Sequence, residues 1–168
     1  MTHYMVTQLK LTRHKWLLAF ENVSPEDAVK RIEPMNCISW FIGHLAFHEH
    51  HWWVEMGQGR TIAPEVNRFA WGQPASTPPL EEVRALWHRI TPEADLFLDS
   101  LTQADVDFRQ LAWEGKVREE NIGMMLLRMT YHYWYHIGES QAVRQMLGHS
   151  DLPSFIGKVP PEFQYKPE

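Results

Sequence analysis

Hydrophobic residues recur along much of the chain at intervals of three and four, the pattern of a helix with one buried face. The first such stretch covers about residues 7–22, where Leu9, Trp16 and Phe20 mark the apolar side. Ser24 and Pro25 then favour a short helix, because serine caps the first turn and proline suits the first helical position. The sequence thus begins with one long and one short helix.

A second long helix is predicted for about residues 37–56. Asn36 is its candidate N-cap, and Gly57 follows its last turn. Residues 57–79 contain four of the eleven prolines and three of the nine glycines, so they are predicted to form a long loop. Loops of this length are often functional.

The third long helix is predicted for about residues 77–101, and Pro92 inside it should kink or interrupt it. A connector with a short extended piece around residues 108–113 leads to the fourth long helix, at about 118–147, which Gly148 stops. Four long helices with a long loop between the second and the third predict an all-α fold, a four-helix bundle.

Length and composition fit one globular domain. The chain has 168 residues, of which 44% are hydrophobic and 22% are charged, as in an ordinary globular protein. We expect a single domain over residues 1–168, with a helical core at about 5–148 and a proline-rich coil tail at 149–168.

Charge and cysteine content exclude several classes of function. The net charge of −5 leaves no basic excess for a nucleic-acid partner. No run of 18 apolar residues is present, so no membrane span is expected, and no signal peptide is visible at the N-terminus. The single cysteine, Cys37, excludes an intrachain disulfide and a cysteine-rich zinc site. These features together favour a cytoplasmic protein.

Four of the ten histidines lie within the stretch GHLAFHEHHWW of the second predicted helix. Residues three, four or seven apart share one side of a helix. His44, His48 and His51 therefore form one set, which we expect to face inward. His50 is rotated away and is expected in solvent, and Glu49 also points away from the set.

The fourth predicted helix has its own pair, His132 and His136, four residues apart. Met125, Met129 and Val143 share their face, so both imidazoles should point into the bundle. Neutral imidazole is a preferred ligand of Zn, Ni, Cu and Fe, so histidines from two helices are candidate ligands of one divalent metal. Hydrogen-bonded core histidines are the alternative, and the spacing alone leaves both open.

Two segments together resemble one known family. NCISWFIGHLAFHE and, some eighty residues later, HYWYHIGESQAVRQMLGH are similar to the motifs Trp-x-x-x-His-Leu and His-x-x-x-His-x-Gly of the DinB-like superfamily, which includes the bacillithiol and mycothiol S-transferases. The resemblance covers about residues 5–148. It implies an up-down-down-up four-helix bundle, usually a homodimer, with a metal held by three histidines.

Carried onto this chain, the resemblance assigns the metal ligands to His44, His132 and His136, with Zn or Ni as the expected metal. Glu139 stands where many relatives have Gln. His48 and His51 are additions to the family's ligand set, either as partners of the ligands or, for His48, in place of His44.

The resemblance also implies an activity. Relatives of known chemistry use the metal to activate a low-molecular-weight thiol, so we expect a metal-dependent thiol S-transferase acting on a small-molecule substrate. We expect the substrate to enter past the loop at 57–79, where Phe69 and Trp71, with Trp40, are candidates for lining the pocket. Simple packing is the alternative for these rings. For the whole protein, the alternative is a non-catalytic, stress-related helical bundle that binds a ligand or partner, with histidines or metal only structural.

Overall fold

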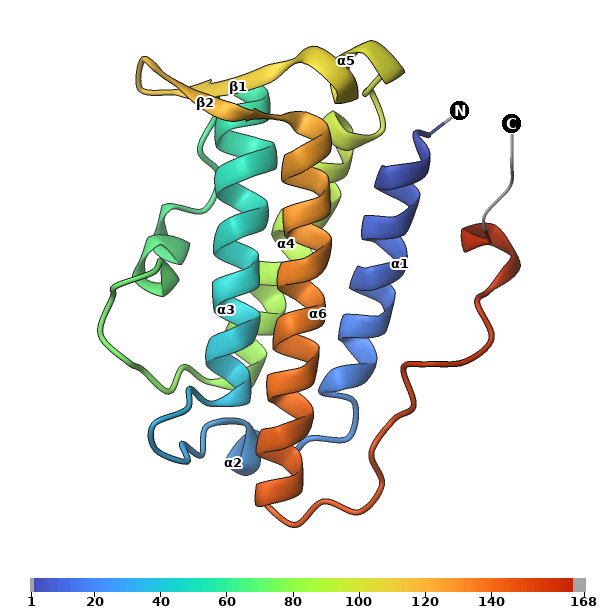
Figure 1. Ribbon diagram of the computed structural model, residues 1–168. Coiled ribbons are helices and arrows are strands. Elements are labelled where there is room, and N and C mark those ends of the chain that lie inside the picture. Colours follow the sequence, from blue (N-terminus) through green and yellow to red (C-terminus); the bar gives the residue numbers. More distant parts are fainter. Residues whose placement is uncertain (1, 165–168) are drawn as a thin grey trace.

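The computed structural model describes residues 2–164 and is mostly helical (Figure 1). A π-helical segment, η1 (His50–Met56), continues the helix α3. α1 packs against α6, α3 packs against α4, and α3 also contacts α6. Of the predicted all-α fold, the mostly helical character is confirmed, but the chain also forms a two-stranded sheet. The four long helices are α1 (Tyr4–Ala19), α3 (Ile38–Glu49), α4 (Leu80–Leu98) and α6 (Ile122–Met146).

Short elements lie in the connections between the long helices. α2 (Pro25–Ala28) begins after Ser24, whose side chain accepts from the backbone N–H of Asp27, as the capping prediction requires. The predicted cap Asn36 is wrong: Cys37 is the N-cap of α3, and no side chain caps that end. The long loop before α4 is present, and it contains the 3₁₀ helix η2 (Pro64–Phe69).

Pro92 does not interrupt α4, contrary to one of the two outcomes expected for it. The helix runs on because Ile90, Ala94 and Phe97 are buried on both sides of the proline, and their packing outweighs one lost backbone hydrogen bond. α4 nevertheless ends at Leu98, three residues earlier than predicted. α5 (Gln103–Phe108) follows behind a capping box formed by Thr102 and Asp105.

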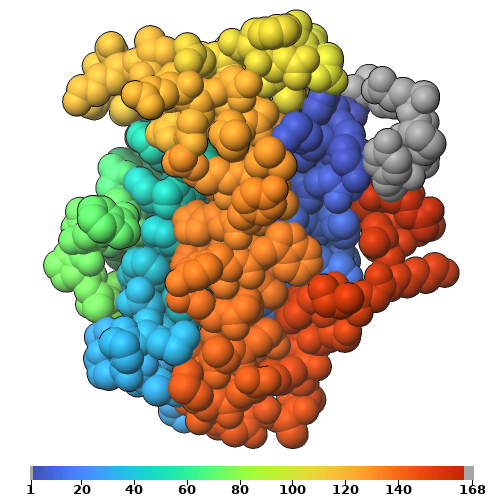
Figure 2. Space-filling view, in the orientation of Figure 1, coloured from blue at the N-terminus to red at the C-terminus, as the bar shows by residue number. Residues whose placement is uncertain are grey.

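A β-hairpin replaces the predicted start of the last helix. β1 (Gln110–Trp113) confirms the expected extended piece, and β2 (Lys116–Asn121) pairs with it in antiparallel orientation. The prediction of helix from residue 118 is therefore wrong. Glu114 and Gly115 connect the strands with φ of 50° and 76°, as a two-residue hairpin turn requires. Figure 2 shows the hairpin lying across one end of α6.

The C-terminal segment follows α6 after Gly148, whose φ of 86° suits the end of a helix. It runs as coil along α1, apart from the 3₁₀ turn η3 (Pro161–Phe163). The side chain of Gln8 donates to the carbonyl of Phe163 at 3.2 Å and ties the segment down. Residues 165–168 of the predicted tail lie outside the described residues. Within residues 2–164, no helix has the length and apolar character needed to cross a bilayer.

Candidate metal centre

Three histidines from two helices meet between α3 and α6. His44 lies on α3, and His132 and His136 lie one turn apart on α6. One ring nitrogen from each lies within 4.8 Å of the other two. We call these three residues the histidine cluster. The contact between α3 and α6 thus unites the same three residues that the family resemblance had singled out.

The orientation of His44 is fixed by the backbone of the long loop. Its Nδ1–H donates to the carbonyl of Phe69 at 2.7 Å, so its Nε2 keeps a free lone pair. Gly43 allows this approach: a Cβ there would lie 2.8 Å from the ring of Phe69. The glycine before the motif histidine therefore lets the loop come close enough to orient the imidazole.

His136 is oriented by a carboxylate. Its Nδ1–H donates to Oε2 of Glu139 at 2.7 Å, which leaves its Nε2 directed to Nε2 of His132 at 2.9 Å. A carboxylate or a carbonyl behind a metal-ligating histidine is the usual arrangement, because it fixes the tautomer and raises ligand basicity. Glu139 and the Phe69 carbonyl both occupy this position.

Burial keeps two members of the histidine cluster neutral. Desolvation is the main cause that lowers the pKa of His44 to about 4 and that of His132 to about 3, with smaller contributions from neighbouring histidines. Both rings are therefore uncharged at neutral pH, the protonation state that can donate a lone pair to a metal.

His48 lies against the histidine cluster without belonging to it. Its ring centroid is 4.7 Å from that of His44 and 4.6 Å from that of His132. Its Nδ1 is buried without a hydrogen-bond partner. Burial, reinforced by His44, lowers its pKa to about 2. His48 thus adds an uncharged polar wall to the site, and the grouped nitrogens come from His44 rather than from His48.

His51 and His50 have other partners. His51 bonds through Nδ1 to Oε2 of Glu55 at 2.8 Å, outside the histidine cluster. The prediction that His50 faces solvent is wrong, because the chain folds back over it. Its Nε2 accepts the backbone N–H groups of Ile62 and Ala63 at 3.0 and 3.1 Å. Helical periodicity could not reveal this burial, since it comes from a loop.

The three candidate pocket residues lie in different surroundings. Trp40 is buried and stacks on His44, with ring centroids 4.7 Å apart. Phe69 is buried and acts on the site through its carbonyl rather than through an exposed ring. Trp71 is 91% exposed. Of these three candidates, Trp40 and Phe69 contact the histidine cluster.

A second buried polar group escaped prediction. Glu49, which was expected to point away from the histidines, is fully buried and accepts two hydrogen bonds from Arg13 of α1, at 2.7 and 2.5 Å. Tyr133 of α6 donates to it at 2.7 Å. Trp87 Nε1–H donates to Tyr133, and Asp95 binds Arg13. We call these five residues, which link all four long helices, the ion-pair network.

Charge pairing governs the ion-pair network. Burial alone would lower the pKa of the Arg13 guanidinium, but the charge and hydrogen bonds of Glu49 outweigh it, and the pKa is raised. Burial raises the pKa of Tyr133 well above its ordinary value, so its hydroxyl stays protonated and donates. An acidic residue in a largely apolar helix was the available signal, but its partner Arg13 lies 36 residues away in the sequence.

The donor set of the histidine cluster fits a divalent transition metal. Nitrogens bound to one Zn²⁺ at about 2.0–2.1 Å lie roughly 3–3.5 Å apart, which is within the observed spread. Three imidazole ligands suit Zn or Ni, and three protein ligands leave a position for a further ligand, as in catalytic sites.

Comparison with known proteins identifies the family. The model of the DinB superfamily matches residues 8–140, most of the chain. The match includes His44, His132, His136 and Glu139. No protein with a curated description matches the chain.

Proposed function

Because this chain belongs to the DinB superfamily, we propose that it is a metal-dependent thiol S-transferase. His44, His132 and His136 hold a divalent transition metal, Zn or Ni, and the metal activates a low-molecular-weight thiol. Its helices form the up-down-down-up bundle of that superfamily.

One observation carries this proposal: three imidazoles converge with two of their outer nitrogens already bound to oxygen acceptors. The carbonyl of Phe69 and the carboxylate of Glu139 take the Nδ1–H groups of His44 and His136. Both Nε2 lone pairs are then left for an electrophile.

The chain's own residues prepare the site for a thiol. A bound divalent metal lowers the pKa of a coordinated thiol, so that the thiol is ionised at neutral pH. Trp40, stacked on His44, and Phe41, whose ring centroid is 5.1 Å from that of His136, shield the imidazoles from water. His48, whose ring centroid is 4.6 Å from that of His132, adds a neutral polar group beside the imidazoles.

Elemental analysis of protein purified without a histidine tag tests the proposal. We expect about one equivalent of transition metal per chain, either as purified or after reconstitution with Zn²⁺ or Ni²⁺. Less than about a tenth of an equivalent after reconstitution contradicts it.

Substitution of one ligand gives a second test. His132→Ala should weaken metal binding more than 100-fold, beyond the roughly 10–100-fold that loss of an outer hydrogen-bond partner usually costs. His51→Ala is the control, because His51 lies in the same stretch as the proposed ligand His44 but bonds to Glu55. Equal metal affinity in the two variants refutes the assignment.

Thiol transfer to chloro-dinitrobenzene or monochlorobimane separates catalysis from mere binding. We expect metal-loaded protein to accelerate the reaction of a small thiol, and His132→Ala protein to lose the acceleration. Full metal occupancy without acceleration for any thiol tested favours the alternative, a ligand-binding helical bundle in which the metal is structural.

We also propose that the protein is a homodimer. α6 presents a stripe of exposed apolar side chains of the kind that a second subunit covers, along the helix in front in Figure 2. Light scattering should give about twice the chain mass of 19.8 kDa. A mass of one chain contradicts this proposal. The stripe consists of Met124, Leu127, Tyr131 and Tyr135.

A further inference from the structure

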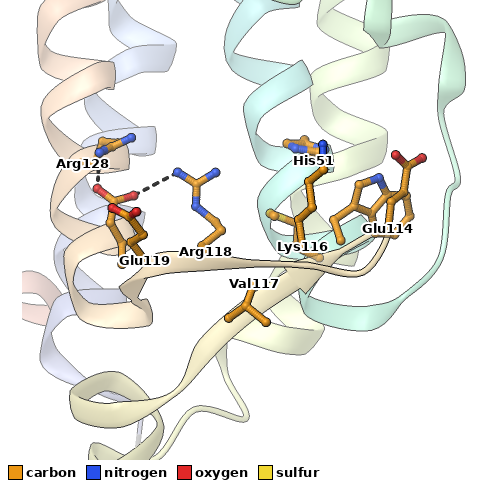
Figure 3. A pocket seen from close by; sticks show the side chains of 10 residues that line it. His51, Glu114, Lys116, Val117, Arg118, Glu119 and Arg128 are labelled. Carbon is orange, nitrogen blue, oxygen red and sulfur yellow. Dashed lines mark hydrogen bonds and ion pairs between the residues drawn. The ribbon is translucent and has the colours of Figure 1, made fainter.

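A pocket of about 510 Å³ opens at the hairpin end of the helices, and its volume lies in the range of small-molecule sites. Figure 3 shows it from close by, with His51 of η1 on the same side of the hairpin as Arg118. None of the three residues of the histidine cluster lines it. The pocket is therefore separate from the candidate metal centre, and its own lining residues decide which ligand suits it.

The charged residues around the pocket do not favour a charged ligand. Three basic and three acidic side chains line it, and Glu120 accepts from both Arg118, at 2.9 Å, and Arg128. A neutral, partly apolar molecule suits such a lining, because it brings no charge that would need a partner. The apolar lining residues are Met56, Trp113 and Val117.

His51 is held in one orientation by two contacts. Its Nδ1 lies 2.8 Å from Oε2 of Glu55, whose side chain is only 7% exposed. Its ring stacks on that of Phe47, with ring centroids 5.6 Å apart and planes inclined by 6°. Thr61 donates to the other carboxylate oxygen of Glu55 at 3.1 Å and fixes that carboxylate in turn. A solvent-exposed ion pair on a helix lacks such support, so Glu55 orients the imidazole of His51.

This orientation leaves one nitrogen of His51 for a ligand. A carboxylate can only accept, so the proton in the 2.8 Å contact belongs to Nδ1, and the neutral imidazole then carries its lone pair on Nε2. Nε2 makes no hydrogen bond within residues 2–164, and the side chain is 27% exposed. The ring of Trp113 stands nearly perpendicular to that of His51, with centroids 6.4 Å apart. A hydrogen-bond acceptor and an aromatic wall thus lie next to each other in the pocket.

From this geometry we infer that the pocket binds a neutral, phenol-like molecule, with an aromatic ring and a hydroxyl group. The hydroxyl donates to Nε2 of His51, Glu55 keeps that nitrogen unprotonated, and the ring packs against Trp113. A carboxylate is disfavoured, because the lone pair of Nε2 repels it and Glu120 already binds both arginines. The site needs no metal, so it goes beyond the proposed function.

p-Cresol and its methyl ether form a matched pair of probes, since they share the ring and only p-cresol can donate a hydrogen bond. Each is titrated into ¹⁵N-labelled protein at about pH 8, where phenols are neutral, and the indole N–H resonance of Trp113 is followed. p-Cresol should bind about 3–10-fold more tightly, the effect of one hydrogen bond. No shift up to about 10 mM p-cresol, or equal affinity for the two probes, overturns the inference.

p-Toluate tests whether charge matters, because it has the same ring with a carboxylate in place of the hydroxyl. We expect it to bind more weakly than p-cresol, since the basic and acidic side chains of the pocket balance. Tighter binding of p-toluate would mean that the pocket recognises negative charge, and this result overturns the inference.

His51→Phe removes the acceptor and keeps an aromatic ring beside Phe47, so the affinity for p-cresol should fall to that for its methyl ether. His14→Phe is the matched control: His14 also stacks on a phenylalanine, Phe163, with centroids 6.2 Å apart, but does not line the pocket. Preference for p-cresol retained in His51→Phe protein, or lost equally in His14→Phe protein, overturns the inference.

The ring nitrogens of wild-type His51 cover the case in which His51→Phe protein does not fold. Their ¹⁵N chemical shifts should identify Nδ1 as protonated and Nε2 as unprotonated, and p-cresol should move the Nε2 resonance. A protonated Nε2, or an Nε2 resonance that stays in place while the Trp113 shift saturates, overturns the inference.

The pocket and the metal centre are tested separately by these titrations, because they use the full chain as purified and follow residues outside the histidine cluster. Protein that binds p-cresol but takes up no metal refutes the proposed function and sustains the pocket site. Protein that takes up metal but binds no p-cresol overturns the pocket site and leaves the proposed function intact.

Discussion

The histidine cluster and the ion-pair network are two buried polar groups in one helical core, and they differ in how their members are satisfied. In the ion-pair network each buried donor meets an acceptor, from the guanidinium of Arg13 on Glu49 to the indole of Trp87 on Tyr133. The histidine cluster differs, because ring nitrogens of His132 and His136 face one another instead of a carboxylate or carbonyl oxygen. Both residues were predicted to be metal ligands.

The two groups are interleaved along the same helices. His48 and Glu49 are neighbours in the chain, as are His132 and Tyr133, yet the first of each pair faces the histidine cluster and the second faces the ion-pair network. The difference shows that burial of polar groups does not by itself mark a site. A closed set of partners stabilises the fold, whereas converging lone pairs leave room for a ligand.

The largest effect is expected from breaking the ion-pair network. Glu49→Ala leaves the buried Arg13 charge with only Asp95, so the free energy of unfolding should fall by about 3–5 kcal/mol. Urea denaturation of metal-free protein measures it. Glu81→Ala, at an exposed site on α4, should change it by less than about 0.5 kcal/mol. A similar small change for Glu49→Ala would show that the network is dispensable.

Substitutions beside the histidine cluster should change the affinity for metal rather than the stability of the fold. Glu139→Ala removes the acceptor of the His136 Nδ1–H, and we expect a loss of about 10–100-fold in affinity for Zn²⁺. Competition with a chromogenic chelator measures it. Glu139→Gln, whose amide oxygen can still accept, should lose less. Affinity that is unchanged in both variants argues against an orienting role for Glu139.

Tyr133→Phe tests whether the ion-pair network and the histidine cluster are independent, because Tyr133 is adjacent to His132. Loss of the hydroxyl leaves the Trp87 indole N–H buried without a partner, so the free energy of unfolding should fall by about 1–3 kcal/mol. Zn²⁺ affinity should stay at the wild-type value, although His132 is the adjacent residue. A joint loss of stability and metal affinity would mean that the two groups act as one unit.

The smallest effect concerns pH. A histidine kept neutral in the folded state takes up a proton in the unfolded state below its ordinary pKa of 6.5, so the metal-free protein loses stability as pH falls from about 6.5 toward 4. Each such histidine contributes at most about 1.4 kcal/mol per pH unit. Denaturation of wild-type and His48→Gln protein between pH 7.5 and 4.5 should show a shallower dependence in the variant. Parallel curves would mean that His48 titrates normally.

The sequence predicted helices well where a strong local signal was present, such as regular apolar spacing or a capping residue. The spacing of apolar residues located the four long helices, and Ser24 located the start of α2. Errors arose where partners lay outside the element. Residues 118–121 pair with β1 instead of joining α6, and Asn121 rather than an earlier residue caps the helix by accepting from Met124. Backbone pairing between strands is not encoded in helical periodicity.

The sequence by itself determined which side of each helix is apolar, and with it the pairing of His132 and His136 one turn apart. Only the tertiary structure decided that the Phe69 carbonyl orients His44, that a loop buries His50, and that Glu49 finds Arg13. The physical reason is that these contacts depend on the distance between separate elements. A helical period fixes direction around one axis, whereas a hydrogen bond forms only when packing brings two elements within about 3 Å of each other.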